Sequence, residues 1–220
     1  LAIILTTMMF TSLFVLSQSM IENMQQMYIQ QAGYSSQLSS SLLTDDEADA
    51  IAEHPAVAEA SRSTVVGVAE NVSGRQVELR AASADYADSA LSLPTEGRMP
   101  ENADEIALDT ITLDKLGLAH QLGETVHFSW TSAPGSDAHE TADFTLCGIW
   151  QGNPAAMASM AWVSEDFAEK LSVGVDQNAA RESGSILGLT MLHIDLVDDS
   201  DPSGTAEKIL ADTGLSERVT

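Results

Sequence analysis

The stretch that decides the fold is Glu96-Gly97-Arg98-Met99-Pro100-Glu101-Asn102-Ala103-Asp104-Glu105-Ile106-Ala107-Leu108. It runs from a glycine through a proline and an acidic loop into a short apolar segment that is typical of a strand. Gly97 suits a backbone position with unusual dihedral angles, and Pro100 stiffens the approach to the strand. Arg98 can pair with Glu101 or with Glu105 across the loop. The pattern predicts a structural hinge at a boundary between two lobes rather than a chemical site.

Three further glycines follow at positions where the chain is expected to turn. Asp109 is a predicted N-cap for a helix over residues 110–116, and Gly117 is placed for the left-handed turn that ends it. Gly123 precedes a predicted strand, and Gly148 lies near the end of another one. The segment after the opening stretch is therefore expected to alternate short strands with a short helix.

The whole chain shows an α+β pattern of mixed strands and several short helices. Alternating apolar residues and turn signals predict strands over residues 58–70, 75–82, 105–108, 125–131, 141–150, 161–163 and 185–195. Capping signals predict helices over residues 44–54 and 110–116, a helix beginning at 164, and a last helix over 202–212.

The N-terminal segment predicts a membrane span. Residues 1–21 carry no charge, and as a helix they would extend over about 31 Å, the thickness of the bilayer core. We expect the span to be truncated at its start, because the sequence opens on Leu1 rather than on Met. No Lys or Arg precedes Arg62, which indicates that the residues after about 21 are extracytoplasmic.

A stalk is expected to continue from this span over residues 22–41. From the end of the span onward, side chains recur at helical spacing, namely Met20, Met24, Met27, Tyr28 and Gln31. The alternative is a cleaved signal peptide, because Ser17-Gln18-Ser19 has the small side chains of a cleavage site.

The charge balance limits the possible partners. The chain has 220 residues with 9 Lys and Arg against 33 Asp and Glu, which gives a formal net charge of −24. Nucleic acid is excluded as a partner, because binding to phosphates requires basic residues. Cationic peptides, divalent cations and basic proteins remain compatible with this surface. The single cysteine, Cys147, rules out an intrachain disulfide and is expected to be a buried, inert thiol.

No catalytic, cofactor-binding or metal-ligating residue is predicted. The five histidines show no H-x-x-x-H or H-E-x-x-H spacing, and neither a G-x-S-x-G nor a G-x-x-x-x-G-K-[ST] sequence occurs. His193 lies in an apolar segment and is expected to be a hydrogen-bonded core or edge residue. The acidic segments at 45–49 and 199–204 are better explained as helix N-termini than as cation sites.

Taken together, the opening stretch resembles the signature of FtsX-like and MacB-like ABC transporter permeases, G-R-x-P-x-x-x-x-E-I-x-L. The resemblance continues through a helix ending in Leu-Gly, a G-x-x-V segment and an apolar strand ending in Gly-Ile, and residues 1–21 stand where the family has its first membrane helix. We call the matching positions the signature residues: Gly97, Arg98, Pro100, Glu105, Gly117, Gly123 and Gly148.

The resemblance implies a fold like that of the MacB periplasmic core. Residues 42–94 with 186–220 would form a membrane-proximal lobe, and residues 95–185 an inserted distal lobe. The implied partners are a cytoplasmic ABC ATPase subunit, a second permease copy, and an unknown substrate or external protein. The implied function is non-catalytic: the domain would transmit ATP-driven motion from the cell membrane to its outer side.

A second hypothesis from the sequence is a secreted or membrane-anchored acidic binding or sensor module. The acidity and the possible cleavage site motivate it. A third hypothesis, an acidic envelope hydrolase, has less support, because no spacing singles out one pair of carboxylates.

Overall fold

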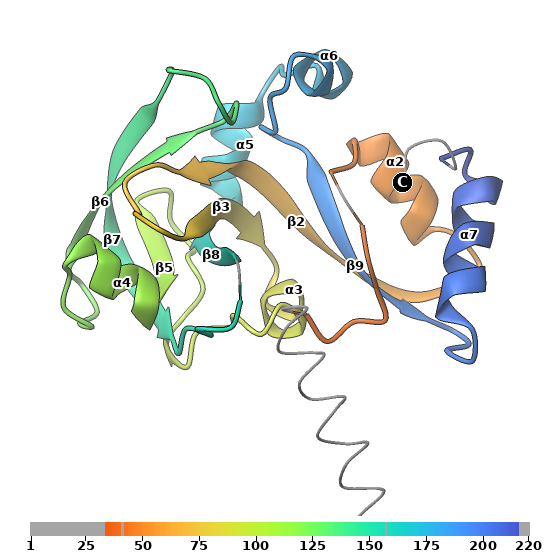
Figure 1. The fold of residues 1–220 in the computed structure, drawn as a ribbon, viewed down its shortest axis with the longest axis horizontal. Helices are drawn as coiled ribbons and strands as arrows, with labels where there is room; N and C mark the ends of the chain where they lie inside the picture. Colours follow the sequence, from red (N-terminus) through yellow and green to blue (C-terminus); the bar gives the residue numbers. More distant parts are fainter. Residues whose placement is uncertain (1–33, 41, 157, 216–220) are drawn as a thin grey trace, which may run out of the picture.

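The computed structural model describes residues 34–40, 42–156 and 158–215, which form a mixed α/β fold as predicted (Figure 1). The strands are β1 (Leu38–Ser39), β2 (Val57–Ala69), β3 (Gln76–Ala82), β4 (Glu96–Gly97), β5 (Glu105–Asp109), β6 (Thr125–Thr131), β7 (Glu140–Trp150), β8 (Ala158–Val163) and β9 (Thr190–Leu196). The helices are α2 (Asp45–Ala52), α3 (Ala84–Ser89), α4 (Thr110–Leu116), α5 (Glu165–Ser172), α6 (Gln177–Glu182) and α7 (Pro202–Asp212).

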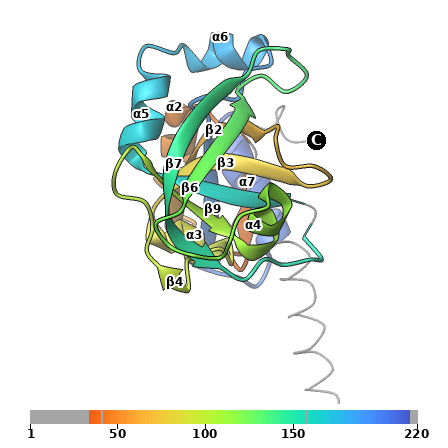
Figure 2. The same ribbon diagram turned by 90° about the vertical axis from the view of Figure 1, so that its left-hand side faces the viewer.

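Most of the strands belong to a closed circuit. Among the described residues the sheet has the order β1-β9-β2-β3-β8-β5-β7-β4, and β6 pairs with both β2 and β7. The circuit therefore runs β2-β3-β8-β5-β7-β6 and returns to β2. Figure 2 labels β2, β3, β6 and β7 of this circuit. The β3–β8 and β5–β7 pairs are parallel and the other pairs are antiparallel. Because the circuit is closed, each of these six strands has a paired strand on both sides.

Apolar side chains that alternate along the strands fill the interior of this circuit. In β3 the buried members are Val77, Leu79 and Ala81, as the sequence pattern predicts. Strand β6 contributes Phe128 and Trp130, and α4 and α5 each add a buried residue to the same cluster. Burying a side chain of this size stabilises the folded state by about 1.5–3 kcal/mol, so this cluster dominates the packing.

A second apolar cluster lies at the other end of the molecule. Helices α2 and α7 lie beside β9 there (Figure 1) and bury Ile51 and Ile209 against Leu192 and Ile194. Strand β2 pairs with β9 along its first part and with β6 at its end, so one continuous strand joins the two clusters.

A third cluster covers the other face of β3 and corrects one expectation. The alternation predicts that Arg80 faces solvent, but it is only 3% exposed. The reason is α3, a helix that the sequence analysis did not predict, which lays Tyr86 over this face. Tyr86 meets Trp162 edge to face at 6.1 Å, and the indole of Trp162 donates a hydrogen bond to the Ser92 carbonyl at 2.9 Å.

Helix starts are the local features that the sequence predicts best. Side chains at the predicted helix starts accept hydrogen bonds from the first turns of α2, α4, α5 and α7; they are Thr44, Asp109, Ser164 and Asp201. Thr44 forms the predicted reciprocal capping box with Glu47. The cap at Asp201 confirms the interpretation of the acidic segment 199–204 as a helix N-terminus.

Three further segments differ from the prediction. The strand predicted over 185–195 begins only at Thr190, because Gly188 adopts φ 76° and Leu189 closes a turn onto the Ile186 carbonyl. The short helix α6 precedes this turn and was not predicted. The segment before Pro100, where no strand was predicted, contains the short strand β4, which pairs with β7.

The predicted membrane span, residues 1–21, and most of the predicted stalk, residues 22–41, lie outside the described residues. Within the described part of the chain, no helix is both long enough and apolar enough to cross a membrane. The two-lobe division near residue 94 stays a prediction; β2 and β3 share the closed circuit with strands of residues 95–185.

Candidate functional site

The pair of Arg98 and Glu105 organises the signature stretch. The guanidinium donates to both carboxylate oxygens, from Nη1 to Oε2 at 2.8 Å and from Nη2 to Oε1 at 2.6 Å. Oε2 of Glu105 also accepts from the backbone N–H groups of Glu101 and Asn102 at 2.9 and 3.0 Å. The hydrogen bonds from Arg98 have the largest effect and those from the two N–H groups add to it. Together they hold the pKa of Glu105 well below its usual range. The sequence left two partners open for Arg98, and the structure selects Glu105.

The signature glycines Gly97 and Gly148 allow β4 to lie directly against β7. Gly97 adopts φ 76°, and a Cβ at this residue would lie 2.1 Å from the Cys147 carbonyl oxygen. A Cβ at Gly148 would lie 2.3 Å from the Arg98 carbonyl oxygen. Both positions therefore require glycine for close backbone approach. Pro100 lies partly buried in the loop that leads from β4 to β5.

The remaining signature residues serve nearby turns. Gly117 ends α4 in the left-handed conformation with φ 72°, as predicted. Gly123 has φ 86°, and its N–H donates to the Leu146 carbonyl of β7 at 2.8 Å. The structure thus brings Gly97, Arg98, Glu105 and Gly148 together around β4, β5 and β7 and places Gly117 apart from them at the end of α4. The hinge role of these residues stays a prediction.

Replacing Glu105 with glutamine is expected to lower the free energy of unfolding by about 2 kcal/mol, because the amide loses the charge and one accepting oxygen of the Arg98 fork. Glu101→Gln is the matched control: its carboxylate is 3.9 Å from Arg98 and its side chain is 73% exposed. An exposed pair of this kind contributes little, so the control is expected to change stability by less than about 0.5 kcal/mol. Urea unfolding measures the free energy of unfolding of both variants. Equal losses of stability in the two variants would contradict the role given to Glu105.

Cys147 differs from the expected buried thiol. It is only partly buried, and its Sγ lies 3.6 Å from the Arg98 carbonyl oxygen. Burial, with the nearby Glu105 charge, raises the pKa of the thiol to about 11. The thiol is therefore protonated at neutral pH and is a poor nucleophile, as expected for an inert cysteine.

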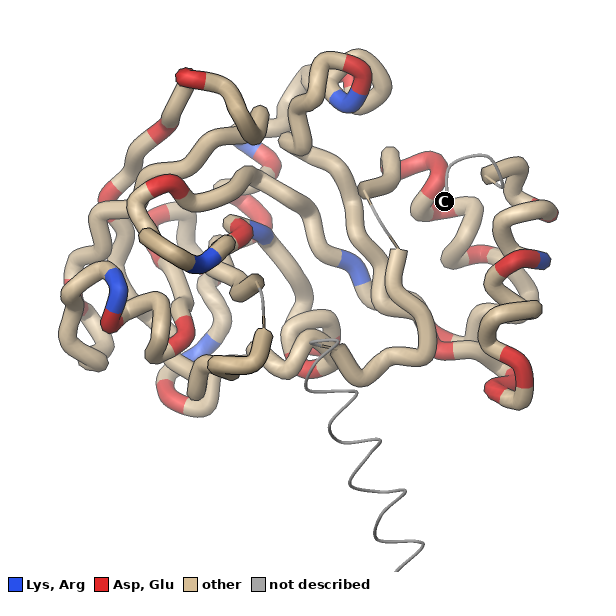
Figure 3. Tube along the Cα trace, in the orientation of Figure 1, with Lys and Arg blue, Asp and Glu red and all other residues tan. Residues whose placement is uncertain are grey.

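Carboxylates are spread over the molecule rather than concentrated in one segment (Figure 3). In the described residues, no three of His, Cys, Asp or Glu form a group that could hold a metal ion. Four histidines instead form separate contacts with one carboxylate each, at 2.6–3.2 Å; the pairs are His54–Asp212, His120–Asp114, His127–Asp143 and His139–Glu70.

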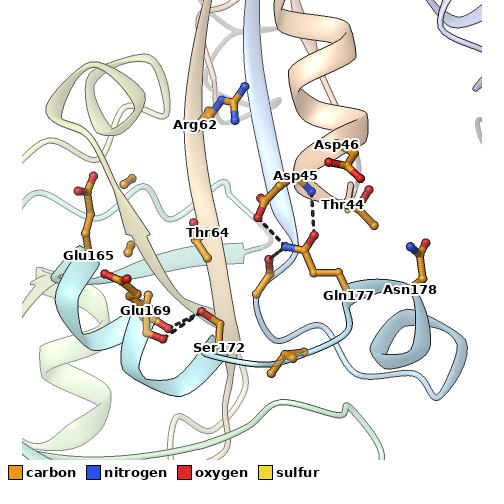
Figure 4. A pocket seen from close by; sticks show the side chains of 15 residues that line it. Thr44, Asp45, Asp46, Arg62, Thr64, Glu165, Glu169, Ser172, Gln177 and Asn178 are labelled. Atoms are coloured by element: carbon orange, nitrogen blue, oxygen red, sulfur yellow. Dashed lines mark hydrogen bonds between the residues drawn. The ribbon is translucent and has the colours of Figure 1, made fainter.

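A polar pocket of about 560 Å³ lies between α2, α5 and the start of α6 (Figure 4). The Gln177 amide ties its floor together, since Nε2 donates to Asp45 at 3.0 Å and Oε1 accepts from the Asp45 N–H at 2.8 Å. Asp46, Glu165 and Glu169 add three more carboxylates to the lining. The pocket can attract a cation electrostatically, but its lining supplies no activated nucleophile.

A buried polar cluster around Arg80 was missed by the sequence analysis. The guanidinium donates to the Tyr86 hydroxyl at 3.1 Å and to the Glu78 carboxylate. Tyr86 in turn stacks on His193, with ring centroids 4.1 Å apart, and Nδ1 of His193 lies 2.6 Å from the Ser89 hydroxyl oxygen. His193 is thus a buried, hydrogen-bonded residue, as expected. The one available signal was a lone arginine in a half-apolar strand.

Comparisons with known proteins agree with the resemblance in the signature stretch. The family description of the MacB-like periplasmic core domain matches residues 1–211. No curated protein sequence matches the chain.

Two solved structures show what the chain is similar to. The periplasmic region of MacB from Actinobacillus actinomycetemcomitans has 14% identity and a TM-score of 0.45, over 78% of this chain and 75% of that one. The extracellular domain of the noncanonic ABC-type transporter YknZ from Gram-positive bacteria has 10% identity and a TM-score of 0.48, over 81% of this chain and 86% of that one. Since the family match covers nearly the whole sequence, the chain belongs to the MacB-like periplasmic core domain family and forms the extracytoplasmic core domain of a MacB-like ABC transporter permease.

Proposed function

We propose that this domain couples ATP hydrolysis by a cytoplasmic ABC ATPase to substrate export, or to an action on an external partner, by mechanotransmission. The observation that carries the proposal is the family match, which joins the apolar residues 1–21 and the described domain in one unit. In this proposal residues 1–21 form the membrane helix, residues 22–41 form the stalk, and a second permease copy completes a dimer.

The contacts of residues 34–40 support a mechanical connection. The Ser35 N–H donates to the Ser89 carbonyl of α3 at 2.7 Å. The Gln37 side chain accepts from the Leu196 N–H of β9 at 2.5 Å, and β1 pairs with β9. A displacement of this segment would therefore act on both α3 and β9.

Strand β2 supports transmission across the domain. It has 13 residues, pairs with β9 near the N-terminal segment, and reaches β6 of the closed circuit at its far end. A paired strand is stiff along its length, so motion received at β9 would reach residues 95–185, the proposed distal lobe. Residues 42–94 with 186–220 would form the proposed proximal lobe.

The first experiment is purification of the full-length permease from gently solubilised membranes. We expect an ATPase subunit to co-purify. Spin labels at Val173→Cys, a position that is 73% exposed, in a Cys147→Ser background are then expected to show a distance between two permease copies that changes on ATP binding. A protein that purifies alone and shows no such change would contradict the proposal.

The variant Gln37→Ala tests the mechanical connection. We expect it to reduce the ATP-dependent distance change, because it removes the side-chain contact to β9 while the ATPase is unaltered. Gln121→Ala, in an exposed loop before β6, is the matched control and is expected to behave as the wild type. Equal behaviour of the two variants would show that this contact does not transmit motion.

The acidic binding module is the second candidate, and the carboxylate-lined pocket of Figure 4 favours it. Mature protein in the culture medium that begins near Met20 would support this function against the transporter.

A further inference from the structure

A second pocket, of about 330 Å³, lies beside the buried Arg80 cluster on the face of the sheet that α3 covers. Strands β3, β8 and β9 contribute to its lining, together with α3 and the segment after β7. We call it the arginine groove, after Arg75 and Arg80. Its volume is within the range of small-molecule sites in proteins.

The groove brings two arginines together in a chain with only nine basic residues. Arg80 is 3% exposed, and its Nε–H has no hydrogen-bond partner in the described part of the chain. Among the described residues the buried Nε–H of Arg75 also has no partner, and its Nη2 donates to the Asn153 carbonyl at 3.3 Å. No described carboxylate lies within ion-pair distance of Arg75, although the chain carries 33 acidic residues.

This arrangement is costly unless a further acceptor arrives. A buried guanidinium donor without a partner loses its hydration and gains nothing in return. Arg80 forms an ion pair with Glu78, so the guanidinium without a described counter-charge is that of Arg75. The planar fork of an arginine matches a carboxylate, which can accept two parallel hydrogen bonds from it.

The remaining lining is suited to an apolar body. Trp150 and Tyr86 provide aromatic surfaces, and both are nearly fully buried from solvent. Met160 and Met191 line the same groove. Methionine side chains are flexible and polarisable, so they adapt to hydrocarbon chains of different shape.

We propose that the arginine groove binds an amphipathic organic anion, with its carboxylate on Arg75 and its apolar chain along Trp150 and Met160. The ligand carboxylate supplies the hydrogen-bond acceptor that the Arg75 guanidinium lacks. The apolar chain of the ligand is removed from water when it lies along the aromatic and methionine side chains of the groove. This inference goes beyond the coupling function and does not depend on it. The strongly negative surface selects against anions elsewhere on the domain.

The test uses the full chain in phosphatidylcholine nanodiscs and follows quenching of tryptophan fluorescence by 8-bromooctanoate. We expect saturable quenching, and much weaker quenching by the neutral 8-bromooctanol and by the cationic (8-bromooctyl)trimethylammonium. The variant Trp150→Phe is expected to lose most of the quenching. Trp130→Phe removes an indole of the closed circuit and is expected to keep it.

Arg75→Gln is expected to raise the dissociation constant for 8-bromooctanoate at least about tenfold, as expected for the loss of a charge-assisted pair. Arg62→Gln removes the same charge from the pocket of Figure 4 and is expected to leave binding unchanged. The proposal is overturned if the two variants bind equally, if the three head groups quench equally, or if no saturable quenching occurs at millimolar probe.

Discussion

Replacing Gly97 with alanine is expected to lower the free energy of unfolding by about 3–4 kcal/mol. Two effects add. A residue with a Cβ is strained at φ 76°, and the new methyl group would lie 2.1 Å from the backbone oxygen of Cys147. A backbone atom cannot rotate away, so β4 must separate from β7. Separation disrupts the hydrogen bonds from the Arg98 N–H to Cys147 and from the Thr95 N–H to Ile149.

The matched control is Gly123→Ala. Gly123 has φ 86°, but a Cβ there would have nothing within 4 Å. Only the backbone strain remains, which costs about 1 kcal/mol. Urea unfolding of both variants in nanodiscs, followed by tryptophan fluorescence, measures the difference. Similar losses for the two glycines would show that close approach of β4 to β7 contributes little.

The stability of the wild type is expected to fall by about 2–3 kcal/mol more than that of His193→Phe between pH 7 and pH 4. Burial, together with the charge of Arg80, lowers the pKa of His193 to about 4. In the unfolded chain the imidazole takes up a proton near its ordinary pKa of about 6.5. As the pH falls below 6.5, the unfolded state binds a proton that the folded state rejects, and stability is lost down to about pH 4.

The surroundings of His193 make the phenylalanine variant a suitable comparison. The ring is 6% exposed and lies between Tyr34 and Tyr86, so Phe retains the aromatic contacts but cannot titrate. Carboxylates line a small pocket that His193 shares, namely Glu59, Asp85, Asp88 and Asp195. The same carboxylates are present in both proteins, so their effect cancels in the comparison.

Ser89→Ala provides a second comparison for the same residue. It removes the hydrogen bond at Nδ1 and keeps the imidazole buried beside Arg80. We therefore expect Ser89→Ala to retain the steep pH dependence of the wild type. Urea titrations give the free energy of unfolding at each pH. Parallel curves of this free energy against pH for the wild type and His193→Phe would rule out burial of a neutral imidazole as the cause of the pH dependence.

Features that depend on neighbouring residues could be predicted from the sequence. The helix caps at Thr44, Asp109 and Asp201 and the left-handed turn at Gly117 were all predicted, because each requires only a few consecutive side chains. The signature stretch indicated the family for the same reason. Its turn, proline and apolar strand are a local pattern that is visible without any partner.

Features that depend on distant segments could not be predicted. Closure of the strand circuit depends on pairing between β2 and β6, which are separated by three other strands in the chain. The strand predicted at 185–195 was too long, because the Leu189 N–H closes a turn onto the Ile186 carbonyl and the strand begins only after it.

By itself, the sequence determined the fold class, the helix starts and the family of this protein, because apolar periodicity, caps and glycine turns depend on residues that are close together in the sequence. Only the tertiary structure decided that Glu105 is the partner of Arg98, that α3 buries Arg80, and that no carboxylate of the described residues pairs with Arg75. The physical reason is that burial and pairing depend on which surfaces meet in space. Residues far apart in the sequence supply those surfaces.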